Sequence, residues 1–481
     1  MPSKMGSKTD LPELESFLLD DKSKMRDTAS NKFKNGKHPE KGEIEYFDPF
    51  LERNLEHPTT DCDTLTHLLK ASLGTGILAM PQAFKCSGLL VGVFATIFVS
   101  LVCTFCSYTL VKCAHILYRR TKVTAMSFAD VAEVAFANGP SWSRKLSYLS
   151  RQVILILLFV TYFGTCCVYT VIIATNFQQV ILHYTKVEVD IRWYILMLTL
   201  PLILLSYVPN LKYLAPFSTL ANLLMASGLG ITFYYLIQNL PAISERPQYG
   251  TLDTFPAFFS ITVFAMEAIG VVMPLENNMK TPKHFLGVFG VLNLGMGGVT
   301  IVYIMLGFLG YLQYGEGTKD SITLNLPTVD IAAQLAKIFI SLAVFFTYGL
   351  QFYVCLEIGW NQIQGCYEKA SMFHNYILRT ILVLASVGVA IAVPSISPFI
   401  GLIGAFCFSL LGIIAPVIIE LATCWDNVTL WMKFRNFVLI IVGIMALIFG
   451  TSSSVSDILK LYLSTSTSAG GLTNGTSVAA V

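Results

Sequence analysis

One apolar stretch, from Thr66 to Phe84, constrains the fold more than any other part of the chain. It is apolar enough to lie in a bilayer, yet it carries Gly74-Thr75-Gly76 at its middle and Pro81 further on. A glycine inside a helix costs about 1 kcal/mol relative to alanine. The pattern predicts an interrupted helix, and main-chain groups freed inside a membrane must be buried in protein or line a wet cavity. We interpret the stretch as half of a substrate site formed by Ser72, Gly74, Thr75 and Gly76.

Composition places the chain among helical membrane proteins. Of its 481 residues, 54% are hydrophobic and only 13% are charged, whereas soluble domains carry roughly 25% charged residues. Apolar runs of about 20 residues, each long enough to span a bilayer as a helix, recur along the chain. We therefore expect an all-α polytopic membrane protein with eleven transmembrane helices. The candidate spans are residues 65–84, 88–117, 148–177, 192–208, 216–239, 254–274, 285–312, 331–360, 376–394, 397–422 and 433–451.

The loop charges predict the orientation and the domain boundaries. Positive residues cluster after the second span, namely Lys112, Arg119, Arg120, Lys122, Arg144, Lys145 and Arg151. Because cytoplasmic loops carry an excess of Lys and Arg, this loop and the N-terminus are expected in the cytoplasm. We expect a disordered cytoplasmic tail over 1–60, a transporter domain over 61–451 and a flexible extracellular or lumenal tail over 452–481. Asn474 would then be a glycosylation acceptor.

A second interrupted helix is expected in the sixth span. Glu267 lies near its middle, followed by Gly270 one turn later and Pro274 further on. A carboxylate near the bilayer centre costs about 2.5–3.5 kcal/mol and normally faces a cavity or a partner. The two breaks open blocks of five spans, at about 64–240 and 253–425, and leave an extra helix at about 433–451. This arrangement predicts a five-plus-five inverted repeat with broken first and sixth helices.

Two facing breaks suit a zwitterionic ligand. Half-helix N-termini present N–H groups and partial positive charge to a carboxylate. Half-helix C-termini and a buried acid suit an ammonium group or a proton. Phe264, Ala265 and Met266 are expected to shape the space for the ligand's side chain, next to Gly270. The pattern by itself also fits close helix packing through small residues.

Three separated motifs resemble one family. They are HLLK followed by GTGILAMPQAF, then FAMEAIGVVMPLENNMK, and then SITLNLP at 321–327. Over residues 60–455 the chain resembles the proton-assisted amino acid transporters of the amino acid/auxin permease family, within the amino acid–polyamine–organocation superfamily. The resemblance implies symport of protons with small neutral amino acids (glycine, alanine and proline), in plasma membranes or in lysosomal and endosomal membranes. It also allows a nutrient-signalling complex through the N-terminal tail.

The resemblance assigns roles to further residues. His67 of the HLLK motif and Glu267 of the second motif are implied in proton coupling, although Ala268 stands where the family often has glycine. The third and eighth spans border the site in this fold. Their candidate residues are Tyr162, Cys167, Tyr348 and Gln351. The family's vertebrate members share a disulfide between the 3–4 and 7–8 loops, and this chain has no cysteine in either loop.

Other function classes lack a motif. Gly-Met-Gly-Gly at 295–298 lies in an apolar span, and the loop at 315–321 lacks the spacing of a nucleotide-binding loop. We expect no enzyme activity, no cofactor, no metal and no nucleic-acid partner. The expected partners are amino acids, protons and membrane lipids, with a proton gradient as the energy source. A low-flux amino acid sensor and a proton-independent or sodium-coupled carrier remain alternatives.

Overall fold

Long apolar helices dominate the structure, because a backbone in hydrocarbon must satisfy its own hydrogen bonds. The computed structural model describes residues 47–53, 55, 58–208, 211–266, 268–364 and 372–471. Within these ranges, nine helical segments are long and apolar enough to cross a membrane. They are Leu89–Thr121 (α4), Ser147–Thr185 (α7), Phe217–Leu236 (within α10, Leu211–Leu236), Phe255–Asn277, Val291–Gly317, Ile331–Gln364 (α14), Met372–Ala392 (α15), Ile396–Thr423 and Leu430–Lys460.

Two further expected spans take a different form. The first is divided into α2 (Asp61–Ser72), the 3-10 turn η2 (Thr75–Ala79) and α3 (Met80–Ser87). The fourth is a shorter apolar segment, Ile191–Ser206, made of α8 (Ile191–Met197) and α9 (Thr199–Ser206). Within the described residues, these two segments are therefore helical in pieces rather than as single long helices.

Several spans contain more than one helical element. The sixth consists of α11 (Phe255–Met266) and α12 (Ile269–Asn277), and the seventh is α13 (Val291–Tyr314) followed by η5 (Gly315–Gly317). The last two spans contain π-helical turns. Their elements are α16 (Ile396–Leu402), η7 (Ile403–Ile414) and α17 (Ala415–Thr423), then α18 (Leu430–Met445), η9 (Ala446–Gly450) and α19 (Thr451–Gly471).

Short elements connect the spans at both ends of the molecule. They are α5 (Phe128–Ala137), α6 (Ser141–Arg144), η3 (Ile243–Glu245), η4 (Pro282–Phe285), η6 (Ile322–Asn325) and η8 (Trp425–Asn427).

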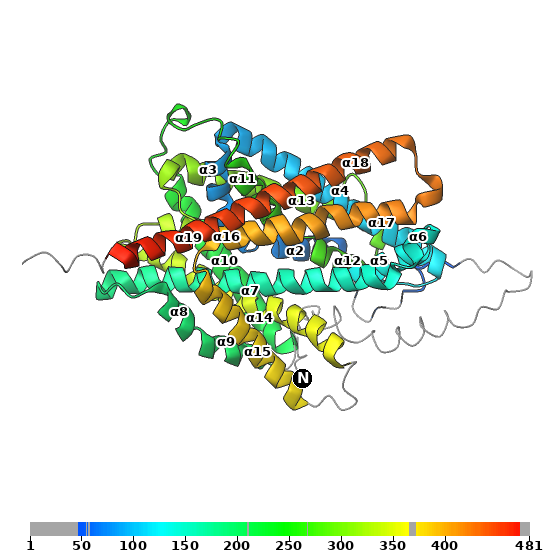
Figure 1. The fold of residues 1–481 in the computed structure, drawn as a ribbon, viewed down its shortest axis with the longest axis horizontal. Coiled ribbons are helices and arrows are strands. Elements are labelled where there is room, and N and C mark those ends of the chain that lie inside the picture. Colours follow the sequence, from blue (N-terminus) through cyan, green and yellow to red (C-terminus); the bar gives the residue numbers. More distant parts are fainter. Residues whose placement is uncertain are drawn as a thin grey trace, which may run out of the picture.

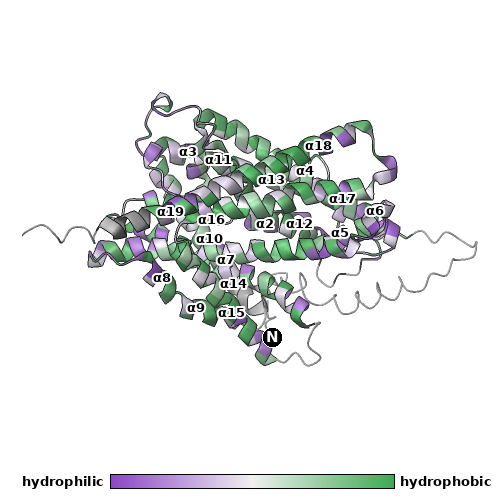
Figure 2. Ribbon diagram, viewed as in Figure 1, coloured by the Kyte–Doolittle hydropathy of each residue, from purple (hydrophilic) through white to green (hydrophobic). Residues whose placement is uncertain are grey.

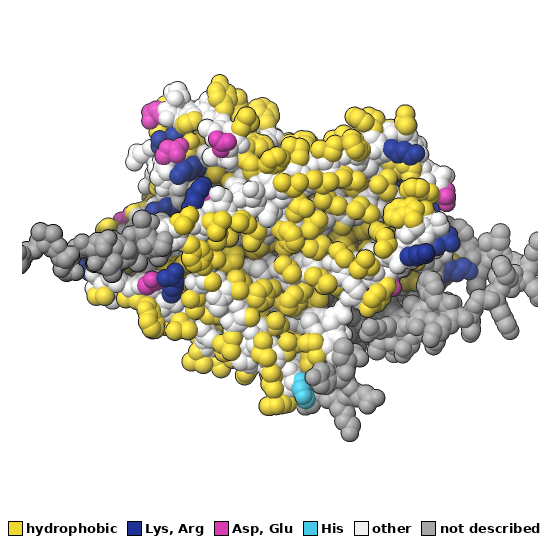
Figure 3. Space-filling view, in the orientation of Figure 1, with side chains coloured by type: hydrophobic (Ala, Val, Ile, Leu, Met, Phe, Trp, Pro, Cys, Tyr) yellow, Lys and Arg dark blue, Asp and Glu magenta, His cyan; other side chains and the backbone are white. Residues whose placement is uncertain are grey.

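The surface has the polarity of a membrane-crossing protein. Figure 1 shows α7 running along the molecule, and α16 and η7 pack against it. Hydrophobic residues occupy most of the long helices, and hydrophilic residues gather in the connections (Figure 2). On the face drawn in Figure 3, charged side chains lie towards the two ends of the long axis, with an apolar region between them. The protein is an all-helical polytopic membrane protein.

The sixth span lies at the centre of the bundle and the last span at its edge. The most apolar part of Phe255–Asn277 is 76% buried, against 22% for Leu430–Lys460. The glycines of α13 allow it to pack closely along both pieces of the first span. A Cβ added at Gly295 would lie 2.6 Å from the Leu68 side chain, and one at Gly310 would lie 2.5 Å from Pro81. The two interrupted helices are therefore held in the interior.

The C-terminal helix is longer than the sequence predicted. We expected the last span to end at residue 451 and a flexible tail to follow, whereas α19 continues to Gly471. Serines at 452–454 resemble a loop by composition, but Ser454 is buried, and its Oγ would be 2.5 Å from a Cβ added at Gly401 of α16. Small residues of this kind promote close helix packing in membranes. Asn474 lies outside the described residues.

The predicted N-terminal tail also includes ordered chain. Before residue 60, Thr59 forms a parallel bridge with Met279, and the Arg53 side chain is only 4% exposed. Composition predicts disorder for residues 1–60 because a polar segment has few apolar groups to bury. It does not show whether such a segment has a buried partner elsewhere in the chain. Residues 1–46 lie outside the described part of the chain.

Candidate substrate site

The first helix is interrupted at Gly74. Helix α2 ends at Ser72, and the N–H of its cap residue Leu73 donates to Leu69 O at 2.8 Å. Gly74 then adopts an extended backbone (φ −80°, ψ −156°), and the 3-10 turn η2 starts at Thr75. Every residue of η2 is buried. Four predicted site residues, Ser72, Gly74, Thr75 and Gly76, therefore lie at a break in the protein interior.

The second break lies between α11 and α12. Helix α11 ends at Met266, and α12 begins at Ile269 after Ala268, whose φ and ψ are −125° and −2°. Phe264, Ala265 and Met266 are all buried at the end of α11. Glu267, the acid predicted to couple protons, lies outside the described residues.

The two breaks touch through backbone atoms. A Cβ added at Gly76 would lie 2.6 Å from the Cα of Ala265, closer than real Cβ atoms approach. Only glycine fits there, because the obstacle is main chain rather than the end of a flexible side chain. Close helix packing, one of the two alternatives that the sequence left open for Gly74-Thr75-Gly76, therefore occurs at Gly76.

Tyr303 of α13 joins the two breaks. Its hydroxyl lies within hydrogen-bonding distance of two main-chain carbonyls, those of Ser72 and Ala265, the latter at 2.8 Å. The Tyr303 side chain is fully buried. The sequence motifs do not point to Tyr303, although Tyr303, Gly307 and Gly310 recur at the spacing of one helix face. That face packs on the first span.

Tyr169 of α7 forms a second connection. Its side chain interacts with those of Thr75 of η2 and Gln351 of α14. It also lies near the position of a Cβ added at Gly74, 3.9 Å from the Tyr169 hydroxyl. Tyr169 follows Tyr162 by seven residues and so shares its helix face, which is the one signal in the sequence that points to Tyr169. The third and eighth spans thus border the first break.

The four candidate residues of the third and eighth spans divide into two pairs. Tyr162 lies beside the second break, since a Cβ added at Gly270 would be 2.6 Å from its hydroxyl, and Gln351 reaches the first break through Tyr169. Cys167 is buried near Cys355. The Tyr348 hydroxyl is 3.1 Å from Ser386 of α15, not at either break.

Three other predicted side chains have distinct settings. Phe264 packs its ring against Phe408 of η7, with centroids 5.8 Å apart. The Ser72 hydroxyl is buried without a hydrogen-bonding partner among the described atoms. His67 lies half-buried on α2, near the charges of Lys70 and Asp63. Since α2 ends at Ser72, His67 is on the N-terminal half-helix and not in the break.

A buried polar network closes the end of α12. The Glu276 carboxylate accepts from Tyr118 at 3.0 Å and lies 2.9 Å from His115 Nε2, both on α4. Arg53 donates to the same carboxylate at 3.3 Å and to the main-chain carbonyl of Glu276 at 2.9 Å. Arg53 also donates to Thr124 O at 2.7 Å. These contacts connect the segment preceding α2, the end of α12 and the loop after α4.

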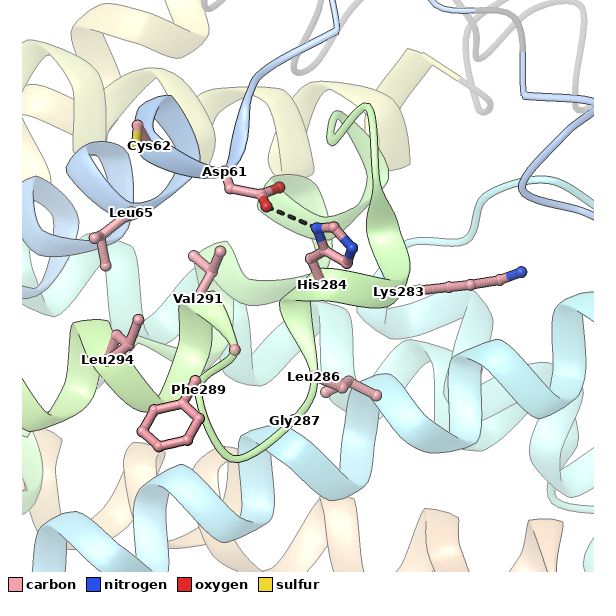
Figure 4. A pocket seen from close by; sticks show the side chains of 11 residues that line it. Asp61, Cys62, Leu65, Lys283, His284, Leu286, Gly287, Phe289, Val291 and Leu294 are labelled. Atoms are coloured by element: carbon pink, nitrogen blue, oxygen red, sulfur yellow. Dashed lines mark hydrogen bonds and ion pairs between the residues drawn. The ribbon is translucent and has the colours of Figure 1, made fainter.

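The start of α2 is tied to the loop after α12. Asp61 accepts from the Thr281 hydroxyl at 2.7 Å, and its other oxygen is 2.8 Å from His284 Nδ1. Asp61 and His284 point toward one another at a surface pocket that Leu65, Val291 and Leu294 also line (Figure 4). Thirteen residues separate Asp61 from Gly74, or about 20 Å along a helix. This pocket is therefore distinct from the breaks.

The sequence of the chain also matches a known family. The family described as transmembrane amino acid transporter protein matches residues 57–456. The chain belongs to this family. The family expected from the three sequence motifs is thereby confirmed.

Two curated relatives support the same assignment. The chain is 58% identical over 419 residues to the proton-coupled amino acid transporter-like protein pathetic of Drosophila melanogaster, covering 86% of this chain and 89% of the relative. It is 28% identical over 404 residues to the amino acid transporter AVT3A of Arabidopsis thaliana, covering 82% and 89%. The family and these relatives are transporters and not enzymes.

A solved transporter shares the fold. The chain resembles the substrate-bound, outward-open structure of a Na⁺-coupled sialic acid symporter, with a TM-score of 0.50 and 12% identity. The match covers 83% of this transmembrane amino acid transporter and 90% of the symporter chain. At this identity the likeness concerns the fold alone.

Proposed function

We propose that the protein is a secondary active symporter that couples protons to small neutral amino acids, with alanine, glycine and proline as the expected substrates. The observation that carries the proposal is the meeting of the two helix breaks around Tyr303, where the carbonyls of Ser72 and Ala265 converge. Converging carbonyls suit an ammonium group, and the N-termini of η2 and α12 suit a carboxylate. The relative named as proton-coupled supports the choice of ion.

The proposed architecture has eleven spans. The nine long apolar segments, the divided segment α2–η2–α3 and the shorter α8–α9 segment make up this number. We infer a five-plus-five inverted repeat in which the first and sixth helices are broken, with α18–α19 as the extra helix. Alternating access would come from movement of spans one, two, six and seven against the others around the breaks.

The proposed orientation places the N-terminus in the cytoplasm and the C-terminus outside the cell or in a lumen, in the plasma membrane or a lysosomal or endosomal membrane. The positive loop after α4 supports it. His67 and Glu267 are the proposed proton-coupling residues, and Asn474 the proposed glycosylation site. No cofactor is needed, because the proton gradient supplies the energy. A nutrient-signalling complex would involve the N-terminal tail.

Proteoliposomes test the function independently of the native membrane. Purified protein is reconstituted, and radiolabelled alanine uptake is measured with an inward proton gradient between about pH 5.5 and 7.5, a range that includes the titration of histidine. We expect uptake that a protonophore abolishes and that does not require sodium. Glu267→Gln should remove the gradient dependence, and His67→Ala should weaken it.

Each other outcome identifies an alternative. Alanine binding without uptake would favour the sensor, and uptake that ignores the proton gradient would favour a facilitator. Uptake that requires sodium would favour a sodium-coupled carrier. Absence of binding to any small neutral amino acid would overturn the proposed substrate class.

A further inference from the structure

Where Tyr303 meets the two breaks, there are more hydrogen-bond acceptors than hydrogen-bond donors. The Tyr303 hydroxyl lies between two carbonyl oxygens, those of Ser72 and Ala265. A phenolic hydroxyl has one proton to donate, whereas each carbonyl oxygen has two lone pairs. The pair of carbonyls therefore retains capacity to accept hydrogen bonds at the point where the hydroxyl lies.

Both carbonyls belong to the C-terminal ends of half-helices. Ser72 is the last residue of α2, and Ala265 is the next to last of α11. A helix C-terminus carries the equivalent of about half a negative charge. Two such ends converge on one buried neutral hydroxyl, so the electrostatic potential there favours a cationic group over a hydroxyl.

The place between the two carbonyls is bounded by backbone atoms, which do not move aside as a side chain does. The breaks are in contact at Gly76 and Ala265, where an added Cβ would lie 2.6 Å from the Ala265 Cα. The Tyr303 side chain has no exposed surface. A group that enters between the two carbonyls must therefore displace the hydroxyl from them.

We propose that Tyr303 is a selectivity residue whose hydroxyl holds the place of a cationic group between the Ser72 and Ala265 carbonyls, and that the ammonium group of the substrate takes this place by displacing it. The inference rests on the proposed function and adds a residue to its site. An ammonium group brings three donors and a positive charge, and charge-assisted hydrogen bonds are about twice as strong as neutral ones. A ligand without N–H donors cannot make this exchange.

Two consequences separate this role from a structural tie between helices. Removal of the hydroxyl should strengthen the binding of ligands that carry an ammonium group, because they no longer displace a hydrogen bond. It should leave unchanged the binding of a carboxylate that has no nitrogen. A residue that only ties the helices together would weaken both or affect neither.

The test is equilibrium binding to the purified full-length protein in lipid nanodiscs, with alanine and propionate as probes. Tyr303→Phe should lower the Kd for alanine about threefold to tenfold, the range expected for one net hydrogen bond. The Kd for propionate should not change. Tyr311→Phe is the matched control, because it removes another buried hydroxyl from α13 that bonds to Glu316 at 3.1 Å. We expect no change in the control.

The same measurement in sodium chloride and in choline chloride distinguishes the cation. An equal gain in alanine affinity in both salts supports the ammonium group, and a gain seen only with sodium would overturn that assignment in favour of a metal cation.

Unchanged or weaker alanine binding by Tyr303→Phe would overturn the proposal, as would an equal gain in affinity for propionate. Thermal denaturation shows whether the Tyr303→Phe variant is folded. If that variant is not folded, Tyr303→Met, which also lacks the hydroxyl, is measured in its place. Wild-type protein that binds no amino acid would instead overturn the proposed function.

Discussion

The guanidinium of Arg53 lies 3.3 Å from the carboxylate of Glu276, and the two side chains are 4% and 0% exposed. This ion pair joins the segment that precedes the first broken helix to the end of the second broken helix. His115 and Tyr118 also contact the carboxylate, from α4. The network therefore ties together spans one, two and six, which belong to the group of spans that the proposed alternating-access movement displaces as a unit.

Arg53→Ala should destabilise the protein strongly. Loss of one partner from a buried ion pair costs about 3–5 kcal/mol, because the other charge stays buried. The midpoint of thermal denaturation of the purified protein measures this. The exposed pair Arg192–Asp190, 3.6 Å apart, is the control. Arg192→Ala should cost less than about 1 kcal/mol, and shifts of equal size in the two variants would contradict the prediction.

Gly76→Ala should impair both folding and transport. The added methyl group would lie 2.6 Å from the Ala265 Cα, and backbone cannot move aside as a side chain does. Overpacking of this kind costs about 1–3 kcal/mol. The yield of monodisperse protein and alanine uptake are the measurements. Gly297→Ala on α13 is the control, since nothing lies within 4 Å of its added Cβ. Normal uptake by Gly76→Ala would show that the breaks separate more than the structure indicates.

Tyr169→Phe should weaken substrate affinity while leaving the fold intact. It removes the hydroxyl that interacts with Thr75 in the first break and with Gln351 of α14. We expect the KM for alanine uptake to rise about threefold to tenfold, as for the loss of one net hydrogen bond. Tyr348→Phe is the matched control, because the Tyr348 hydroxyl bonds to Ser386, at neither break. An equal rise in the control would indicate a general packing effect.

Asp320, in the loop after α13, should make stability depend on pH. Burial raises the pKa of its carboxyl group, although the Ser397 N–H, the Ser395 hydroxyl and the charge of Lys85 oppose the shift. Because the folded protein binds this proton more readily than the unfolded chain, the stabilising contribution is present below the ordinary Asp pKa of about 3.9. It is lost as the pH rises through the raised pKa.

Asp320→Asn removes the cost of ionising the buried carboxyl and keeps an oxygen that accepts hydrogen bonds. Its denaturation midpoint should therefore exceed that of the wild type at neutral pH by a few degrees, and the difference should shrink on acidification. Thermal denaturation over a pH series measures this. A difference that stays constant with pH would show that the substitution acts through packing.

The sequence by itself determined the class of fold, the family and the positions of the two interruptions. Apolar runs of bilayer length have few structural solutions, and glycine, proline and a mid-span acid change helical periodicity locally. Composition did not predict the buried residues before residue 60 or the helix that continues beyond residue 451. Serines 452–454 and Arg53 are polar by composition, and only their neighbours show that Ser454 and Arg53 are buried.

Only the tertiary structure decided which residues meet. Tyr303, Tyr169 and Glu276 carry no local pattern that distinguishes a residue at a helix break from one in ordinary packing. Their roles depend on contacts across large separations in the chain, such as Tyr303 with Ser72 and Arg53 with Glu276. Helix periodicity assigns a face to each residue but not the neighbour that the face meets. The packing of α13 against both broken helices supplies that information.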